Sequence, residues 1–517
     1  MLPVVWIIVA SGAARAWLLF RTPYVPGING AYYLVQARAL LDRGVLGIPD
    51  MPLTFHLHAA VAWTLTQLTH LSQADAIIWA VKCCDAALPP LVAWPVFVLV
   101  RRWARARGHG DAVPLAAAAL ACLALPWILI VGELQKNSLA LVWLALLVTT
   151  LHAWLGTPTT RRGLAVLASL LLLGLTHIGV LGAALVLLAA VMLVYIARHD
   201  RIADWRHILP WIAAGLSLLA ATSAFVMWKY DPARIHRLMT AISSPSVFST
   251  DGKQGPVPPG GAMGLSQWLS WIGFALVVMP SLVVAWRRRH ALPTADMAIV
   301  AGGALTVLLL TGPWFGQDKA MRFALIALLP TIIVGAFALL HVTTPWVRRS
   351  LLGAALLVGI GSTAGYLPQG GQAALNDRAM QELQGLAAFV AEPASTLVVA
   401  PHGAEWWSAW FLHTRIAQLD AVRADDWVRY ERVLILVVKP GAQVAMIGRG
   451  PSPSGGARPP RHGETRPPRA GGGAPPMRDA PIPTDAELLH DGVSLKLVRV
   501  ATPPEFVGHR AGRSAQP

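Results

Sequence analysis

The chain has 517 residues, of which 55% are hydrophobic and only 13% are charged, and its mean hydropathy is +0.54. Apolar runs of about 20 residues recur and can each cross the ~30 Å hydrocarbon core of a bilayer, so the composition excludes an ordinary soluble protein and predicts a polytopic membrane protein. Its three cysteines all lie inside apolar runs, which excludes a disulfide framework and a CxxC metal site.

The first apolar run, residues 3–20, lacks a basic leader and a small-residue cleavage site. We therefore expect a retained span and not a cleaved signal peptide. A polar loop, residues 21–53, follows it and contains the turn-rich stretch TPYVPGINGAYYLVQARALLDRG at 22–44. The next apolar segment, 54–71, carries three histidines and four threonines. We expect it to lie on or dip into the outer leaflet as a juxtamembrane helix, because a crossing would move every later arginine cluster to the outer face.

Arginine clusters follow most of the later apolar runs. They stand at 101–107, 161–162, 198–206, 287–289 and 348–349. Cytoplasmic loops of membrane proteins are enriched in Lys and Arg, so we expect all five on the inner face, and the net charge of +16 then requires no nucleic-acid partner. The result is a multi-pass protein of the bacterial cytoplasmic (inner) membrane with its N-terminus inside, and about eleven spans in residues 1–366. The predicted spans are 3–20, 84–101, 113–131, 137–155, 163–176, 178–197, 208–228, 266–286, 294–312, 323–341 and 350–366.

Residues 367–517 are predicted to form a small α/β domain outside the membrane, because short β runs alternate with helices there. The expected strands are 396–400, 433–438 and 493–500, and the expected helices are 375–391 and one containing 405–414. The proline-, glycine- and arginine-rich insertion 449–483 can bury almost no apolar area and is predicted to be disordered. The fold class expected for the chain is an all-α polytopic membrane domain followed by a small extracytoplasmic α/β domain.

Ionisable residues of the membrane part gather in the loops assigned to the outer face. They are Asp42, Asp50, Glu133, Asp231, Asp251 and Asp318, with Lys136, Lys319 and Arg322 at the membrane boundary. Ionisable groups at membrane depth are costly and tend to face a cavity or a partner, so the set predicts a shared polar site. Solvated loop charges that anchor helix ends are the alternative.

Two further ionisable features lie inside predicted spans. Lys82 and Asp85 are expected to form an i,i+3 ion pair on one helix face. Arg15, in the first span, has no partner nearby in the sequence. Snorkelling to the interface and binding of a lipid head group both stay open for it.

Short motifs stand at the ends of several predicted spans. They are PGINGAYY and IPDMPLTFHL in and after the first outer loop, LPWILIVGELQKNSLAL at the third span, DKAMRFALIALLP before a later span, and EWWSAWFLHTRIAQ in the tail. Their order and layout resemble the GT-C superfamily of polytopic membrane glycosyltransferases. The resemblance implies an enzyme that moves a hexosyl or pentosyl group from a polyprenyl-phosphate-linked donor, at the outer face. The acceptor would be a glycan, lipid or protein of the cell envelope, and membrane lipids would surround the enzyme.

The resemblance also implies which residues catalyse the reaction. In that superfamily an acid in the first outer loop serves as the general base, and the position matched by PGINGAYY holds Asn29, which cannot accept a proton at working pH. Asp50 matches the second acidic position of that loop. Asp50 is therefore the leading candidate for the catalytic base, and Glu133 is the next.

Further residues are expected to contact the substrate. Arg322 and Lys319 would hold the donor phosphate, with help from Lys136. Residues expected around the substrate cavity are Tyr32, Tyr33, His56 and Asp318. The two tyrosines either stack on a sugar or belong to the interfacial aromatic belt. His56 and His58 either ligate a metal or lie at the interface, so no metal ligand is assigned and a divalent ion, Mg or Mn, stays open as a cofactor.

Three functions compete at this stage. The first is the lipid-linked sugar transferase. The second is a GT-C-shaped protein that has lost catalysis and acts in envelope assembly or lipid binding, which Asn29 supports. The third is a transporter, and it is least favoured because the sequence contains no repeated halves with interrupted helices at matching positions.

Overall fold

The computed structural model describes residues 1–198, 265–312, 317–417, 424–442 and 486–501, together with three single residues between 217 and 225. The predicted span 208–228, the insertion 449–483 and the acids Asp231 and Asp251 therefore lie outside the described residues, apart from those three positions. The chain divides into two compact units. One consists of Met1–Leu19 and Gln36–Gln369, and the other of Phe20–Val35 and Gly370–Pro517. The first outer loop thus groups with the C-terminal residues, which the predicted division at residue 366 did not anticipate.

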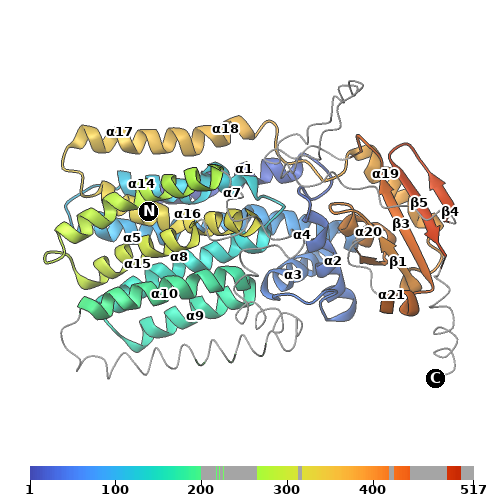
Figure 1. Ribbon diagram of the computed structural model, residues 1–517, viewed down its shortest axis with the longest axis horizontal. Coiled ribbons are helices and arrows are strands. Elements are labelled where there is room, and N and C mark those ends of the chain that lie inside the picture. The colour runs from blue at the N-terminus through green and yellow to red at the C-terminus, as the bar shows by residue number, and fades with distance from the viewer. Residues whose placement is uncertain are drawn as a thin grey trace, which may run out of the picture. The chain divides into compact units, whose positions relative to one another are not determined.

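The first unit is a bundle of helices (Figure 1). Its helices are α1 Leu2–Phe20, α2 Gly30–Arg43 (whose first residues belong to the other unit), α3 Leu53–Leu68, α4 Gln73–Ala87, α5 Ala93–Arg105, α6 Ala112–Leu123, α7 Leu125–Leu129, α8 Gln135–Gly156, α9 Thr160–Thr176, α10 Ile178–Arg198, α14 Leu265–Arg287, α15 Thr294–Leu310, α16 Gln317–Leu339, α17 Pro345–Leu356 and α18 Ser362–Tyr366. A 3-10 turn, Pro89–Val92, joins α4 to α5, and a π-helical turn, Leu357–Gly361, joins α17 to α18.

Seven helices within the described ranges are long and apolar enough to cross a membrane. They are Leu2–Phe20, Gln73–Arg105, Ala112–Leu129, Gln135–Gly156, Ile178–Arg198, Thr294–Thr311 and Ala320–Leu339. Each contains or overlaps a predicted span. Three more predicted spans coincide with the shorter or interrupted helices α9, α14 and α17–α18, so the number eleven is not confirmed.

The segment predicted to lie at the membrane surface forms α3, which packs along α4. Its 16 residues are about 24 Å long at 1.5 Å per residue, which is less than the ~30 Å hydrocarbon core. It is not among the seven candidate spans. Ser72 caps the start of α4, where its side chain accepts a hydrogen bond from the Asp75 amide at 3.1 Å.

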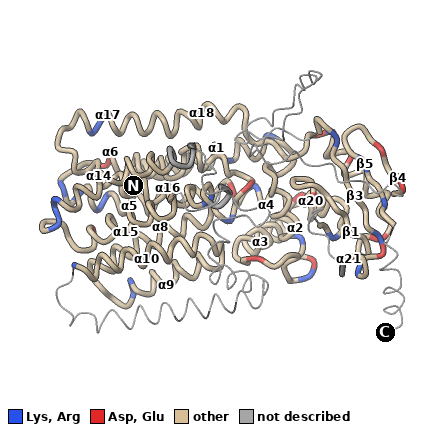
Figure 2. The backbone as a smooth tube through the Cα atoms, in the orientation of Figure 1, with Lys and Arg blue, Asp and Glu red and all other residues tan. Residues whose placement is uncertain are grey.

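Charge is distributed along the bundle as the arginine pattern predicts. In Figure 2 the helices are tan along most of their length, and Lys and Arg gather at the bundle end near α5 and α14. Contacts tie these clusters together, since Arg348 lies 3.3 Å from the His109 ring nitrogens and Arg198 donates to the Arg289 carbonyl. The described arginines of the clusters at 101–107, 287–289 and 348–349, with Arg198, therefore share one end of the bundle.

Helices α10 and α15 pack closely because glycine permits it. A Cβ atom at Gly302 would lie 2.6 Å from the Val191 backbone, which is closer than real Cβ atoms come. Small residues let helix backbones approach in this way inside membranes.

The second unit contains a five-stranded sheet in the order β2-β1-β3-β5-β4. Its strands are β1 Thr396–Val399, β2 Arg415–Ala417, β3 Arg432–Val438, β4 Glu487–Asp491 and β5 Leu495–Val500, and its helices are α19 Asp377–Gly385, α20 Glu405–Leu412 and α21 Ala424–Arg429. Strand β1 pairs in parallel with β2 and β3, whereas β5 pairs antiparallel with β3 and β4. The small α/β fold is confirmed, although β2, β4 and α21 were not predicted.

The first outer loop adds to this second unit. Gly27 forms a parallel β-bridge with Ala373, and its amide donates to the Gln372 carbonyl at 3.1 Å. The Tyr24 ring meets Trp407 edge-on with centroids 5.4 Å apart, and the Tyr32 ring meets Trp406 at 4.7 Å. These aromatic pairs provide packing energy beyond the area they bury.

The turn between β4 and β5 in the second unit is held by Glu382. Its carboxylate accepts hydrogen bonds from the amides of Ser494 and Leu495 and lies 3.1 Å from His490 Nε2. Burial raises the pKa of Glu382. The hydrogen bonds and the nearby His490 lower it by more, so the pKa of Glu382 is below its ordinary value. Its contribution to stability is therefore complete above the unfolded-state pKa of ~4.3 and is lost as the pH falls through the lower folded-state pKa.

We expect Glu382→Gln to speed amide hydrogen exchange in peptides covering residues 490–500 at pH 7, because one hydrogen-bond acceptor oxygen is replaced by a donor group. Exchange in wild type should approach that of the variant as the pH falls from 5 to 3. Glu392→Gln, on an exposed residue of the same unit, is the control. Equal exchange in wild type and Glu382→Gln at pH 7 would contradict this role.

Candidate functional site

The strongest candidate site is the contact between Asp50 and Lys136. Asp50 is 4% exposed, and its Oδ2 accepts a hydrogen bond from Lys136 Nζ. Its Oδ1 accepts the Met51 amide at 2.7 Å. Asp50 lies just before α3 and Lys136 in the first turn of α8, so the structure brings together two residues that are 86 positions apart.

Local structure fixes both ends of this contact. The Gln36 side chain donates to the Ile48 carbonyl at 2.7 Å and accepts the Ile48 amide at 3.0 Å, which holds the loop ahead of Asp50 against α2. The Lys136 ammonium lies 5.4 Å from the centre of the Phe55 ring, in cation–π range. His58, one turn further along α3, is buried, and burial lowers its pKa to about 3, so it is neutral at physiological pH.

Glu133, the second candidate for the base, lies in the turn between α7 and α8, three residues before Lys136. It is half-buried, and its amide donates to the Ile130 carbonyl at 3.2 Å. Gly132, beside it, has a φ of +77°, a conformation that favours glycine. Glu133 is therefore a close sequence neighbour of Lys136, the lysine that contacts Asp50.

The turn is held by a buried ion pair that was not predicted. Arg15 Nη2 lies 2.5 Å from Asp85 Oδ1, and Arg15 also donates to the carbonyls of Asp85 and Trp127. Asp85 Oδ2 accepts the Gly132 amide at 2.7 Å. The predicted pairing of Asp85 with Lys82 is therefore wrong. Arg15 neither extends to the membrane interface nor needs a lipid head group as its partner, because it pairs with Asp85 of α4.

Asn29, Tyr32 and Tyr33 lie in the other compact unit. Asn29 immediately precedes α2, and its carbonyl accepts the Tyr32 amide at 3.1 Å. Tyr33 is 2% exposed, and its ring meets Tyr32 at 5.6 Å. Tyr32 is half-buried and packs on Trp406 as described above. Their roles as catalytic or substrate-cavity residues stay predictions.

The remaining predicted site residues are not drawn into the Asp50–Lys136 contact. Arg322 is exposed in the second turn of α16, and among the described residues no hydrogen bond or ion pair joins it to Asp50, Glu133 or Lys136. The side chains of Asp318 and Lys319 lie outside the described part. His56 is exposed whereas His58 is buried, so the two point to different faces of α3. In the described ranges no group of three or more His, Cys, Asp and Glu could hold a metal ion, so Mg or Mn has no assigned ligands.

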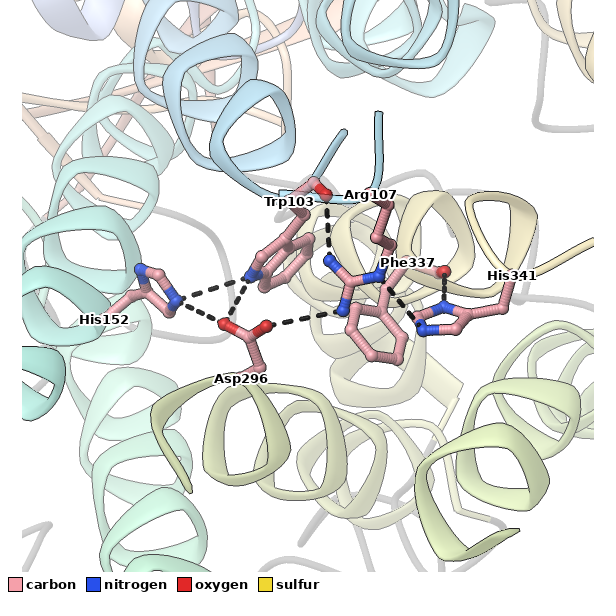
Figure 3. Close-up of polar contacts among 6 residues, drawn as sticks. All are labelled: Trp103, Arg107, His152, Asp296, Phe337 and His341. Carbon is pink, nitrogen blue, oxygen red and sulfur yellow. Dashed lines mark hydrogen bonds and ion pairs between the residues drawn. The ribbon is translucent and has the colours of Figure 1, made fainter. Parts of the chain in front are cut away.

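Figure 3 shows a second polar cluster, which was not predicted from the sequence. Asp296, at the start of α15, accepts hydrogen bonds from Trp103 Nε1 at 2.9 Å and His152 Nε2 at 2.8 Å. Arg107 lies 3.4 Å from its second oxygen and donates to His341 Nε2 at 3.1 Å. His152 stands 16 residues after Lys136 on α8, which is about 24 Å along the axis. The cluster joins α5, α8, α15 and α16 at the arginine-rich end, far from Asp50.

We expect Asp296→Ala to lower the free energy of unfolding by about 3 kcal/mol, because it leaves the Arg107 charge and the His152 ring without their buried carboxylate. Thermal denaturation in detergent measures the change. Asp111→Ala is the matched control, since it breaks an ion pair with Arg101 that is more exposed and should cost about 1 kcal/mol or less. Equal losses in the two variants would show that the Asp296 cluster has no special role.

Comparison with known structures defines the class of this fold. The sequence matches no protein-family model and no curated protein. The fold, however, is similar to those of two solved structures. One similar structure is the oligosaccharyltransferase of Archaeoglobus fulgidus in the apo form, with 12% identity and a TM-score of 0.53 over 84% of this chain and 69% of that one. Another is ArnT from Cupriavidus metallidurans in the apo state, with 13% identity and a TM-score of 0.52 over 96% of this chain and 97% of that one.

Proposed function

We propose that the chain is an integral membrane glycosyltransferase that moves a sugar from a polyprenyl-phosphate donor to an envelope acceptor on the outer face of the cytoplasmic membrane. The observation that carries the proposal is the buried Asp50–Lys136 contact in a chain with a GT-C-like fold. A carboxylate and an ammonium group are the two charges that such a transfer needs. Lys136 lies at the opposite end of α8 from His152, which belongs to the cluster at the arginine-rich end, and this separation supports the choice of face.

In the proposed reaction Asp50 is the general base. The acceptor hydroxyl oxygen attacks the anomeric carbon, its proton passes to the Asp50 carboxylate, and the bond from that carbon to the phosphate oxygen breaks. The electron pair leaves with polyprenyl phosphate. The Met51 amide holds one carboxylate oxygen, so the other, which meets Lys136, is the one that takes the proton.

Lys136 serves the leaving group in this proposal. Its ammonium exchanges the Asp50 oxygen for the donor phosphate, where it stabilises the negative charge that develops as the bond breaks. Arg322, exposed near the start of α16, and Lys319, in the first turn of the same helix, are proposed to bind the same phosphate. Glu133 is proposed as a neighbouring acid that orients the acceptor and not as the base, because Asp50 is the acid in contact with Lys136.

The alternative function is a GT-C-shaped protein that binds lipid in envelope assembly without catalysis. Asn29, at the position where the resemblance implies a carboxylate, favours it. Asp50 supplies a carboxylate in the same predicted outer loop, and it contacts the Lys136 ammonium. Catalysis is the preferred proposal for this reason.

Ligand-induced stabilisation tests the proposal. We expect undecaprenyl phosphate, but not undecaprenol, to raise the thermal midpoint of the purified protein, because a ligand that binds only the native state stabilises it by RT ln(1 + [L]/Kd). Lys136→Met should lose most of this effect. Lys439→Met, which removes a lysine paired with Asp491 in the sheet, should retain it. Equal stabilisation by the alcohol and the phosphate would contradict the proposal.

A further inference from the structure

Three buried polar side chains close in sequence to Lys136 or Phe55 have no hydrogen-bond partner for one or more of their polar atoms within the described protein. They are Gln135, Ser138 and Thr54. Their exposed fractions are 2%, 4% and 2%. Gln135 and Ser138 flank Lys136 in the first turn of α8, and Thr54 lies in the first turn of α3 beside Phe55. Buried polar groups in native proteins are nearly always paired, so three together require an explanation.

Other buried hydroxyl groups of the bundle show what the ordinary arrangement is. Many donate to the carbonyl four residues earlier in their own helix, as Thr149 does to Ala145, Thr306 to Gly302 and Thr331 to Ala327. Ser11 and Ser281 instead donate to carbonyls of other helices. Ser138 does not make this bond, although the Leu134 carbonyl is near enough to accept the Ser138 amide at 3.0 Å. Ser138 and Thr54 depart from this pattern within the bundle, and unpartnered buried atoms in other described parts of the chain belong to Trp143, His152, Trp407 and Thr414.

The chemistry of Gln135 selects the kind of ligand. Both its amide nitrogen and its amide oxygen are without partners, so a matching ligand must offer an acceptor and a donor together. A phosphate offers only acceptors, whereas sugar hydroxyls offer both. Ser138 and Thr54 carry hydroxyls with the same double character, and Lys136 supplies the adjacent positive charge.

We propose that Gln135, Ser138 and Thr54 form the subsite that binds the hydroxyl groups of the donor sugar, next to the phosphate held by Lys136. The inference rests on the proposed function and adds the part of the substrate that these residues recognise. The side chains are enclosed by protein, so sugar binding requires a local movement of the first turns of α3 and α8. A site built to pair with hydroxyls rejects a sugar that lacks the matching one, so this subsite sets sugar specificity.

The test uses Gln135→Leu, Ser138→Ala and Thr54→Val in the full-length protein. We expect each variant to melt at the same temperature as wild type or a few degrees higher, because each removes a polar group that is buried without a partner. Thr149→Val is the matched control. It removes a hydroxyl that contacts the Pro95 and Ala145 carbonyls, so it should melt at a lower temperature and leave ligand binding unchanged.

Binding is measured with two probes, undecaprenyl phosphate and a panel of undecaprenyl-phosphate-linked glucose, galactose, mannose and arabinose. We expect the three variants to bind the best sugar-linked probe at least tenfold more weakly than wild type and to bind undecaprenyl phosphate as wild type does. Variants that bind both probes like wild type, or that melt at lower temperatures like Thr149→Val, would overturn the subsite and leave the proposed function standing. Wild type that binds neither probe would overturn both.

Discussion

Replacing Asp50 by asparagine is expected to lower the rate of sugar transfer by between about 10²- and 10⁴-fold, which is the usual contribution of a positioned general base. The amide keeps the size of the side chain and an oxygen for the Met51 amide, but it cannot take a proton from the acceptor hydroxyl. The rate is measured in proteoliposomes with a polyprenyl-phosphate sugar. Undecaprenyl phosphate binding should persist, because Lys136 remains.

Glu133→Gln is the matched control for Asp50→Asn, because it also replaces a carboxylate by the corresponding amide. We expect Glu133→Gln to slow sugar transfer less than tenfold. A large loss in Glu133→Gln with little loss in Asp50→Asn would exchange the roles of the two acids. Near-normal transfer after alanine replaces both would show that neither is the base.

Breaking the Arg15–Asp85 pair is expected to have the largest effect on stability. Asp85→Leu and Arg15→Met should each lower the free energy of unfolding by about 3–5 kcal/mol, because each leaves a charge buried and unpaired inside the bundle. The double variant should be less destabilised than either single one, since no buried charge remains. Its residual loss, about 1–3 kcal/mol, comes from the Gly132 amide that has lost its acceptor.

Denaturation of the four proteins in mixed detergent micelles gives the coupling energy between the two residues. Losses that simply add in the double variant would contradict the buried pair. The same series reports on the site, because the Gly132 turn leads directly into Glu133 and Lys136. Transfer by the double variant should be slower than wild type even where the protein remains folded.

The sequence predicts the architecture well because the membrane imposes simple rules. Long apolar runs and arginine-rich loops are properties of contiguous residues, so α1, α8, α10 and the bundle end that gathers arginines follow from them. The predicted spans that are not confirmed lie where an element is marginal. Helix α9 has 17 residues, and the segment after α16 is interrupted by a π-helical turn, which hydropathy does not reveal.

The site was predictable only in part, for a different reason. Asp50 and Lys136 could be picked out as separate ionisable residues in outer loops, but their contact joins residues 86 positions apart. Asp85 was assigned to Lys82 because an i,i+3 partner is visible in sequence, whereas its actual partner, Arg15, is 70 residues away. The Asp296 cluster joins residues of four helices that are far apart in the sequence, so no short sequence motif indicates it.

The central claim is that this chain transfers sugar from a lipid-linked donor, and donor consumption tests it most directly. Purified wild type in proteoliposomes is given radiolabelled undecaprenyl-phosphate-linked hexoses and pentoses with an envelope extract as the source of acceptor. We predict that the labelled sugar leaves at least one donor, that polyprenyl phosphate accumulates in equal amount, and that Asp50→Asn prevents both. Folded wild-type protein that consumes none of these donors would contradict the claim.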